Sequence, residues 1–169
     1  MRLEAREIET DLTGLRLIRL RRDHAAALYN LIDRNRGHLT QHGDYQDLGQ
    51  ATPDSVVESL TNPIDQNIKY GIWLNDDLIG RVDLSPRDAG TFVIGYWLGS
   101  DFTGHGYATL ACRSLINDAI QQQLATTIYA GVTKGNVKSE ALLSRLGFTM
   151  IEDRGTYTLF RFTAELPDE

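Results

Sequence analysis

The segment from Phe92 to Gln123 constrains the fold most strongly, because it joins an apolar strand to a long amphipathic helix through a glycine-bearing loop. Phe92–Leu98 is a continuous apolar run typical of a strand inside a sheet. Tyr107–Gln123 carries apolar residues at helical spacing. The loop between them, from Gly99 to Gly106, holds three glycines. Glycines let several backbone N–H groups converge, and a helix N-terminus adds a partial positive charge. The segment predicts either an anion cradle suited to a pyrophosphate or a plain tight connection.

Two common phosphate-binding motifs do not fit this loop. The third glycine of a dinucleotide fingerprint is missing, and no acidic residue ends the following strand. No Gly-Lys-Ser/Thr follows, as a P-loop requires. The loop therefore predicts a different phosphate-binding architecture, if it binds phosphate.

The rest of the chain alternates between strand and helix patterns around this segment. Arg36–Ala51 is polar and predicts a loop with at most one helical turn. We expect one mixed α/β (α+β) domain built around a single sheet and spanning residues 1–169, with its core at about 15–162. The predicted strands are Leu15–Leu20, Lys69–Leu74, Leu78–Leu84, Phe92–Leu98, Thr127–Thr133, Phe148–Ile151 and Tyr157–Phe162, and the predicted helices are Asp23–Asn35, Pro53–Leu60, Tyr107–Gln123 and Ser139–Arg145.

Composition excludes several classes of function. A hydrophobic share of 41% argues against global disorder, and a net charge of −6 disfavours a nucleic-acid partner. No apolar run approaches the ~20 residues that span a bilayer, so no membrane partner is expected. The single cysteine, Cys112, lies on an apolar helix stripe and favours core packing in a reducing compartment. The charged N-terminus lacks the apolar stretch of a signal peptide, and we expect a cytoplasmic location.

A second motif follows the strand Thr127–Thr133. It reads Asn136-Val137-Lys138-Ser139, and Gly147-Phe148 comes eight residues after Ser139. Together with Thr103-Gly104-His105-Gly106-Tyr107-Ala108 and the preceding Ile94-Gly95-Tyr96-Trp97-Leu98, this motif resembles the GCN5-related N-acetyltransferases (GNAT). More specifically, the chain resembles the branch that modifies ribosomal-protein N-termini and small amines, and Asn35–Leu39 is a looser match to the substrate loop of that branch. The resemblance covers about residues 15–162.

The resemblance implies a central, mostly antiparallel sheet with about four helices, in which the parallel strands Phe92–Leu98 and Thr127–Thr133 splay apart around acetyl-CoA. It implies no metal. Asn136 would bond either the pantetheine or the start of its helix. Arg145 would reach the 3′-phosphate or remain a solvated charge. Thr103 departs from the Gln or Arg that is usual there. The implied backbone contacts are Trp97, Leu98 and Gly99 for the pantetheine, and Gly104, His105, Gly106, Tyr107, Ala108 and Thr109 for the pyrophosphate.

The implied chemistry is direct attack of an amine on the thioester. Many members use a helix Tyr to protonate the departing thiolate, but this chain has Leu143 at that position. The ribosomal branch carries a Ser three residues after the Asn, and Ser139 fits that place. Ser139 is therefore expected either to protonate the thiolate or to cap its helix.

The sequence offers two places for the groups that handle the amine. Alternation puts Arg81 and Asp83 on one face of a strand, either as a salt bridge at an exposed face or with Asp83 as the base beside the acetyl group. The loop containing His42 and Asp44 offers a titratable ring and a carboxylate for an ammonium group. A solvated loop is the alternative for the second pair.

We expect an acetyl-CoA-dependent N-acetyltransferase acting on a primary amine. A non-catalytic acyl-CoA sensor and an O-acyltransferase on the same fold are the alternatives. The sequence leaves open the acceptor, the length of the acyl chain, and whether the protein is a monomer or a homodimer.

Overall fold

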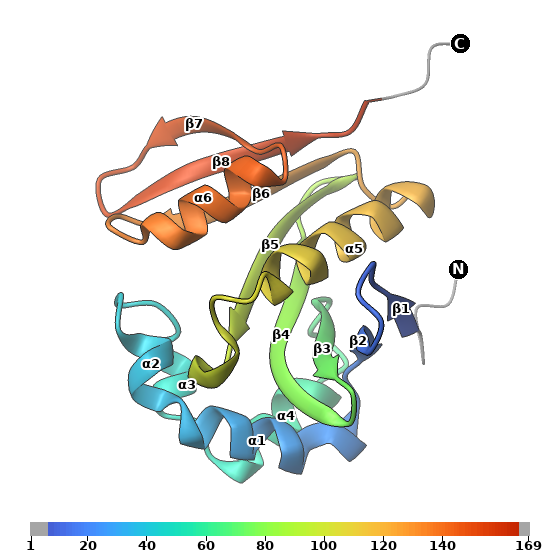
Figure 1. Cartoon of the computed structure of the whole chain (residues 1–169), viewed down its shortest axis with the longest axis vertical. Helices are drawn as coiled ribbons and strands as arrows, with labels where there is room; N and C mark the ends of the chain where they lie inside the picture. Colours follow the sequence, from blue (N-terminus) through green and yellow to red (C-terminus); the bar gives the residue numbers. More distant parts are fainter. Residues whose placement is uncertain (1–6, 166–169) are drawn as a thin grey trace.

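The computed structural model describes residues 7–165. Eight strands form one sheet in the order β1-β2-β3-β4-β5-β6-β8-β7 (Figure 1), and every neighbouring pair is antiparallel except β5 and β6. The mixed, mostly antiparallel sheet predicted from the sequence is confirmed. The strands are β1 (Glu7–Glu9), β2 (Leu15–Arg19), β3 (Ile68–Leu74), β4 (Asp77–Pro86), β5 (Thr91–Leu98), β6 (Thr127–Thr133), β7 (Thr149–Asp153) and β8 (Tyr157–Thr163).

Six α-helices connect and cover the strands. The four predicted helices are present, and the polar stretch from Arg36 to Ala51 contains two more. The helices are α1 (Ala25–Arg34), α2 (Arg36–Thr40), α3 (Gln46–Gly49), α4 (Pro53–Thr61), α5 (Tyr107–Gln121) and α6 (Val137–Arg145), and short 3-10 turns cover Arg22–His24 and Ser100–Phe102. None of the helices within residues 7–165 is long and apolar enough to cross a membrane.

The parallel pair β5–β6 opens along its length. Pairing is limited to Thr91–Val93 against Thr127–Tyr129, at the start of both strands. Beyond that point β5 continues alongside β4 only, and β6 continues alongside β8. The two halves of the sheet therefore diverge, as Figure 1 shows, and the far end of β5 keeps one edge without a neighbouring strand.

Two apolar clusters hold the structure together. The larger one packs α5 and α6 on the sheet and includes Leu17, Ile72, Val82, Leu115 and Leu143. The smaller one packs α1–α4 against Leu78 and Trp97. Each helix contributes its apolar stripe to one cluster, since burying such a stripe against the sheet is the main source of stability for a short helix.

The expectation of a loop with at most one helical turn at Arg36–Ala51 is wrong, because α2 and α3 both form there. The prediction also missed β1, which pairs with β2 through Glu7–Glu9. Both errors have one cause. Elements of three to five residues carry too few positions to show a periodicity, and tertiary contacts decide whether they form.

Candidate functional site

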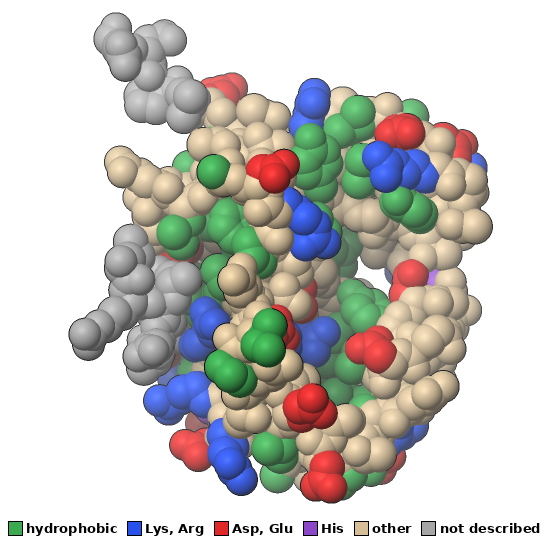
Figure 2. All heavy atoms as spheres, turned by 180° about the vertical axis from the view of Figure 1, so that it is seen from behind, with side chains coloured by type: hydrophobic (Ala, Val, Ile, Leu, Met, Phe, Trp, Pro, Cys, Tyr) green, Lys and Arg blue, Asp and Glu red, His purple; other side chains and the backbone are tan. Residues whose placement is uncertain are grey.

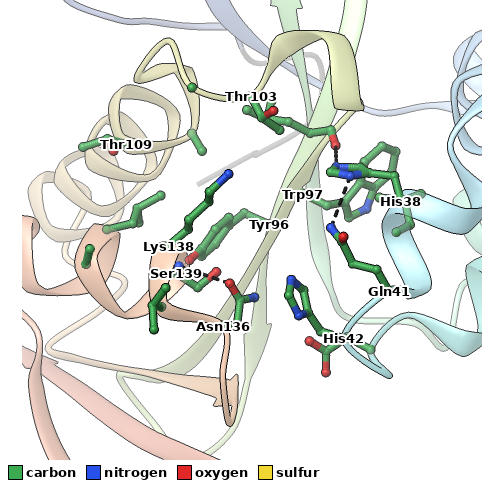
Figure 3. A pocket seen from close by; sticks show the side chains of 18 of the residues that line it. His38, Gln41, His42, Tyr96, Trp97, Thr103, Thr109, Asn136, Lys138 and Ser139 are labelled. Atoms are coloured by element: carbon green, nitrogen blue, oxygen red, sulfur yellow. Dashed lines mark hydrogen bonds between the residues drawn. The ribbon is translucent and has the colours of Figure 1, made fainter.

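A cleft of about 650 Å³ lies where β5 and β6 diverge. Three segments line it: α2 with the loop that follows, the end of β5 with the glycine loop and first turn of α5, and the start of α6 (Figure 3). Most predicted site residues meet here. They are His42, Asp44, Trp97, Leu98, Thr103, Gly104, Gly106, Tyr107, Ala108, Thr109, Asn136, Ser139 and Arg145. Gly99, His105, Arg81 and Asp83 do not line the cleft.

The glycine loop gives the cleft an end that suits an anion. Gly104 and Gly106 have φ angles of 82° and 81°, a left-handed conformation that L residues rarely adopt. Gly106 is the N-cap residue of α5, and no side chain caps the first turn of that helix. Its first N–H groups and the positive end of the helix dipole are thus left for a ligand.

The open edge of β5 presents backbone groups to the cleft. The Gly99 amide donates to the Ile79 carbonyl on β4 at 2.8 Å, so alternation turns the backbone groups of Tyr96 and Leu98 the other way. Two side chains confirm that direction. The Tyr45 hydroxyl donates to the Tyr96 carbonyl at 2.7 Å, and the Leu98 carbonyl lies 3.1 Å from Nε2 of His38. Such an edge can pair with the amide groups of an extended ligand. The expected backbone contacts of Trp97 and Gly99 are therefore wrong, because the backbone groups of Trp97 and the amide of Gly99 face β4.

His38 and Tyr45 are cleft residues that sequence reasoning did not single out. His38 lies inside the segment that matched the substrate loop of the family, which was the one available signal. Tyr45 stands in a polar loop with no pattern around it, and its position depends on a left-handed backbone (φ 55°) just before α3.

The start of α6 is capped by Asn136. Its side-chain oxygen accepts a hydrogen bond from the Ser139 amide at 3.4 Å, so the expectation that Asn136 bonds the helix start is confirmed. The alternative in which Ser139 caps its own helix is wrong, because Asn136 is the N-cap residue and Ser139 lies within the first turn of α6. Its side chain borders the cleft, next to Tyr96 and Asn136 (Figure 3).

Arg145 links the two helices that border the cleft. Its guanidinium donates to the Thr109 hydroxyl at 3.2 Å, which ties the end of α6 to the first turn of α5. Neither of the two roles expected for Arg145 includes this contact. It holds a cation beside the glycine cradle.

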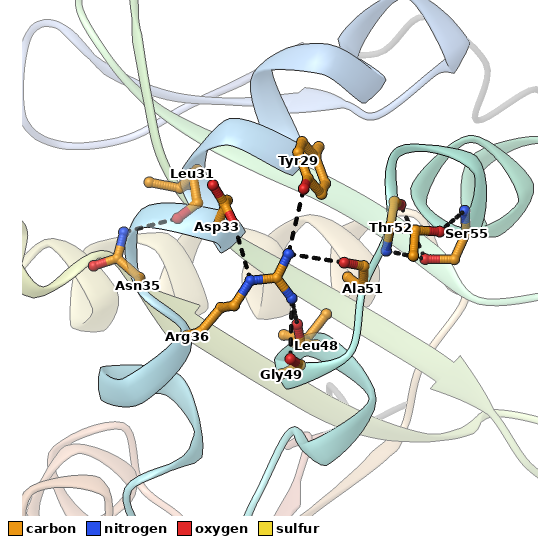
Figure 4. A network of polar contacts seen from close by, with 10 residues as sticks. All are labelled: Tyr29, Leu31, Asp33, Asn35, Arg36, Leu48, Gly49, Ala51, Thr52 and Ser55. Atoms are coloured by element: carbon orange, nitrogen blue, oxygen red, sulfur yellow. Dashed lines mark hydrogen bonds and ion pairs between the residues drawn. The ribbon is translucent and has the colours of Figure 1, made fainter.

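Arg36 fixes the segment that carries His38, His42 and Tyr45 (Figure 4). Its guanidinium donates to Asp33 on α1 at 2.9 Å and to the carbonyls of Gly49 and Ala51 at 3.0 and 2.8 Å. One planar group thus joins the end of α1 to the end of α3, a geometry that only Arg provides. The intervening loop is held at both ends and projects into the cleft.

His42 and Asp44 separate the cleft from a second hollow of about 480 Å³, because they line both. The second hollow is polar and is otherwise formed by Gly43, Gly131, Thr133, Thr156 and Tyr157. The Thr133 hydroxyl on β6 donates to the Asp44 carboxylate across the gap. Figure 2 shows the molecule from behind, with a deep opening and a histidine at its rim. The cleft can therefore be reached from two sides.

Arg81 and Asp83 lie together outside the cleft. Their charged atoms are 3.6 Å apart, and the side chains are 13% and 16% exposed. The salt bridge is thus present, but the expectation of an exposed face is wrong. Burial raises the pKa of Asp83, and Arg81 opposes that shift. Tyr45 connects this ion pair with the cleft, because it lines the cleft and also feels the charge of Asp83. Burial raises the pKa of Tyr45, and the negative charge of Asp83 raises it further.

Within the part of the chain that the structure describes, no three His, Cys, Asp or Glu residues gather as metal ligands would. The fold and the cleft define a class of protein: a mixed α/β domain whose splayed parallel strands border a cleft with an uncapped helix N-terminus at one end. The family described as "Acetyltransferase (GNAT) domain" matches residues 14–149, and the chain belongs to this family. The resemblance seen in the sequence is thereby confirmed.

Individual relatives agree with this assignment. A Bacillus subtilis protein named "Putative ribosomal N-acetyltransferase YdaF" is 34% identical over 83 residues, which are 48% of this chain and 45% of that protein. The match thus spans about half the length of this curated relative.

Solved structures show the same fold. RimL, a ribosomal L7/L12 α-N-protein acetyltransferase in complex with coenzyme A, is similar with a TM-score of 0.83 and 20% identity over 94% of this chain and 98% of that one. RimJ of Mycobacterium smegmatis with a CoA disulfide has a TM-score of 0.77 and 21% identity over 95% of this chain and 88% of that one.

Proposed function

We propose that the protein is an acetyl-CoA-dependent N-acetyltransferase whose acceptor is the α-amine of a protein N-terminus. One observation carries the proposal: a single cleft joins an uncapped helix N-terminus at one end to the polar loop of His42 and Asp44 at the other. The first end suits a pyrophosphate and the second suits an ammonium group. The similarity to RimL, a ribosomal L7/L12 α-N-protein acetyltransferase, and to YdaF, named a putative ribosomal N-acetyltransferase, supports the choice of acceptor.

The cleft residues fit acetyl-CoA in three parts. Backbone N–H groups of the glycine loop, from Gly104 to Thr109, would hold the pyrophosphate. The edge of β5 at Tyr96 and Leu98, which has no neighbouring strand, would pair with the pantetheine amides, and these would share or replace the contacts of Tyr45 and His38 with the two carbonyls. Arg145, already beside Thr109, would meet the 3′-phosphate. The acyl donor needs no metal for any of these contacts.

The acceptor would approach from the side of the second hollow. Its ammonium group would meet the Asp44 carboxylate, and the neighbouring His42 imidazole would accept the proton that the amine must lose. Ser139, on the opposite wall, would face the departing sulfur. We retain Asp83 as a second candidate base, which would act through water because it does not line the cleft. A cytoplasmic location would supply both acetyl-CoA and ribosomal proteins.

The test is thiol release from acetyl-CoA with a panel of amines. The panel contains peptides copying ribosomal-protein N-termini, a polyamine, free amino acids and an alcohol, and mass spectrometry identifies the acetylated atom. A peptide with a blocked α-amine is the matched control. Transfer to the free α-amine alone supports the proposal. Binding of acetyl-CoA without turnover of any acceptor would favour the sensor, and an ester product would favour the O-acyltransferase.

A further inference from the structure

The side chain of Tyr96 contributes a hydroxyl to the cleft that has no partner. Tyr96 lies on β5 and packs against the cluster beneath α5 and α6. Its hydroxyl oxygen is buried, and no hydrogen bond of good geometry joins it to any residue between 7 and 165, although Ser139 lies near enough to affect its pKa. Buried polar atoms in folded proteins almost always have a partner, so an exception inside a ligand cleft needs an explanation.

The surroundings of this hydroxyl keep it protonated. Burial raises the pKa of Tyr96, Ser139 on α6 and Arg145 lower it, and Cys112 on α5 raises it further. Burial is the largest of these effects, so the phenol carries its proton throughout the neutral pH range. Of these groups, Ser139 is the one that acts on the phenol by side-chain hydrogen bonding rather than through its charge, and the two side chains lie next to each other in Figure 3.

We infer that Tyr96 is a positioning residue for Ser139, and that its phenol donates a hydrogen bond to the Ser139 hydroxyl when that hydroxyl turns toward the departing sulfur. The inference rests on the acetyl transfer proposed above. A small rotation of Ser139 supplies the acceptor that the phenol lacks in the free protein. The resulting chain runs from the Tyr96 O–H to the Ser139 oxygen, and from the Ser139 O–H to the sulfur. Hydrogen bonds in such a chain strengthen each other, most of all when they end on a charge.

The chain matches the charge that develops during the reaction. The amine nitrogen forms a bond to the thioester carbon, and the C–S bond breaks with its electron pair going to sulfur. The amine proton leaves to the base or to water. The thiolate thus acquires a full negative charge beside Ser139, and stabilisation at that point lowers the barrier without tightening the binding of acetyl-CoA.

The experiment compares Tyr96→Phe, Ser139→Ala and the double variant, with Tyr129→Phe as a matched control on β6 outside the cleft. Two quantities are measured: kcat for thiol release, and the pKa of the CoA thiol in the binary complex, from the ultraviolet absorbance of its thiolate. We expect Tyr96→Phe to lower kcat about tenfold, within the range for one hydrogen bond between neutral groups, and to raise the thiol pKa. The dissociation constant of CoA and the melting temperature should stay unchanged. Tyr129→Phe should behave like the parent protein.

The double variant separates action through Ser139 from an independent effect. If Tyr96 acts through Ser139, adding Tyr96→Phe to Ser139→Ala changes neither quantity further. Full additivity, or a Tyr96→Phe variant with parental kcat and thiol pKa, overturns the inference. A parent protein that releases no thiol with any amine overturns the proposed function instead. The thiol pKa of bound CoA would still decide the question of Tyr96 in that case.

Discussion

Replacement of Gly106 by Ala tests the anion cradle most directly. The backbone at Gly106 has a φ of 81°, and an added Cβ would meet no atom within 4 Å. The cost to the free protein is therefore backbone strain alone, since nothing is displaced. An Ala in the left-handed region costs roughly 1–2 kcal/mol. For a domain of this size that corresponds to a melting temperature lower by about 2–8 °C.

Gly155→Ala is a matched control for this strain. Gly155 has a φ of 85°, its Cβ would also meet nothing within 4 Å, and it lies in the turn between β7 and β8 rather than in the cleft. The strain should be the same in both variants. Any difference between them in the affinity for acetyl-CoA therefore reports the close approach of the ligand to the Gly106 backbone.

We expect Gly106→Ala to weaken acetyl-CoA binding at least tenfold, which corresponds to about 1.4 kcal/mol, while Gly155→Ala binds like the parent. Isothermal titration calorimetry measures the affinity, and thermal melting of the same preparations measures the strain. Equal affinities in the two variants, with equal losses of stability, would refute the cradle and move the pyrophosphate elsewhere in the cleft.

Three further variants test the remaining roles. Ser139→Ala should lower kcat by ~10²-fold with an unchanged melting temperature, because Asn136 and not Ser139 caps α6; a lower melting temperature with intact kcat would contradict this. Asp44→Asn should lower kcat/KM for the amine at least ~10-fold and spare acetyl-CoA affinity, as steady-state kinetics would show; parental kinetics there, with a loss in Asp83→Asn, would move the amine site to β4. Burial raises the pKa of Asp83, so its contribution to stability declines as the pH rises above about 3.9 and through the folded-state pKa. Between pH 4 and 7, the free energy of unfolding of Asp83→Asn, measured by urea denaturation, should lack that decline. An identical pH dependence in the variant and the parent protein would contradict the prediction.

Residue types and short-range spacing predicted the features of the site that depend only on neighbouring residues in the sequence. The glycines of the loop are conformationally free at the positions where φ is positive, so the turn into α5 could be predicted from Gly104 and Gly106. The period of two in β4 placed Arg81 and Asp83 on one face, and they do form an ion pair. The resemblance to the GNAT family correctly predicts that the strands on the two sides of the cleft lie next to each other and splay apart.

Local patterns failed where two residues satisfy the same rule. Asn136 and Ser139 both precede apolar residues of α6 and both can cap a helix, but only one is at the correct backbone position. The choice depends on where the backbone leaves β6 after Thr133, which no single-residue preference decides.

The sequence by itself determined the longer helices and strands, their order and the positive-φ glycines that lead into α5, because these depend on periodicity and on the backbone freedom of single residues. The tertiary structure alone decided which side chains meet in the cleft. His38 and Tyr45 reach β5 because Arg36 ties α1 to α3, and the Tyr96 hydroxyl lies beside Ser139 because β5 and α6 border the same cleft. Contacts between distant segments depend on the packing of whole elements, and a linear pattern of residue types does not encode that packing locally.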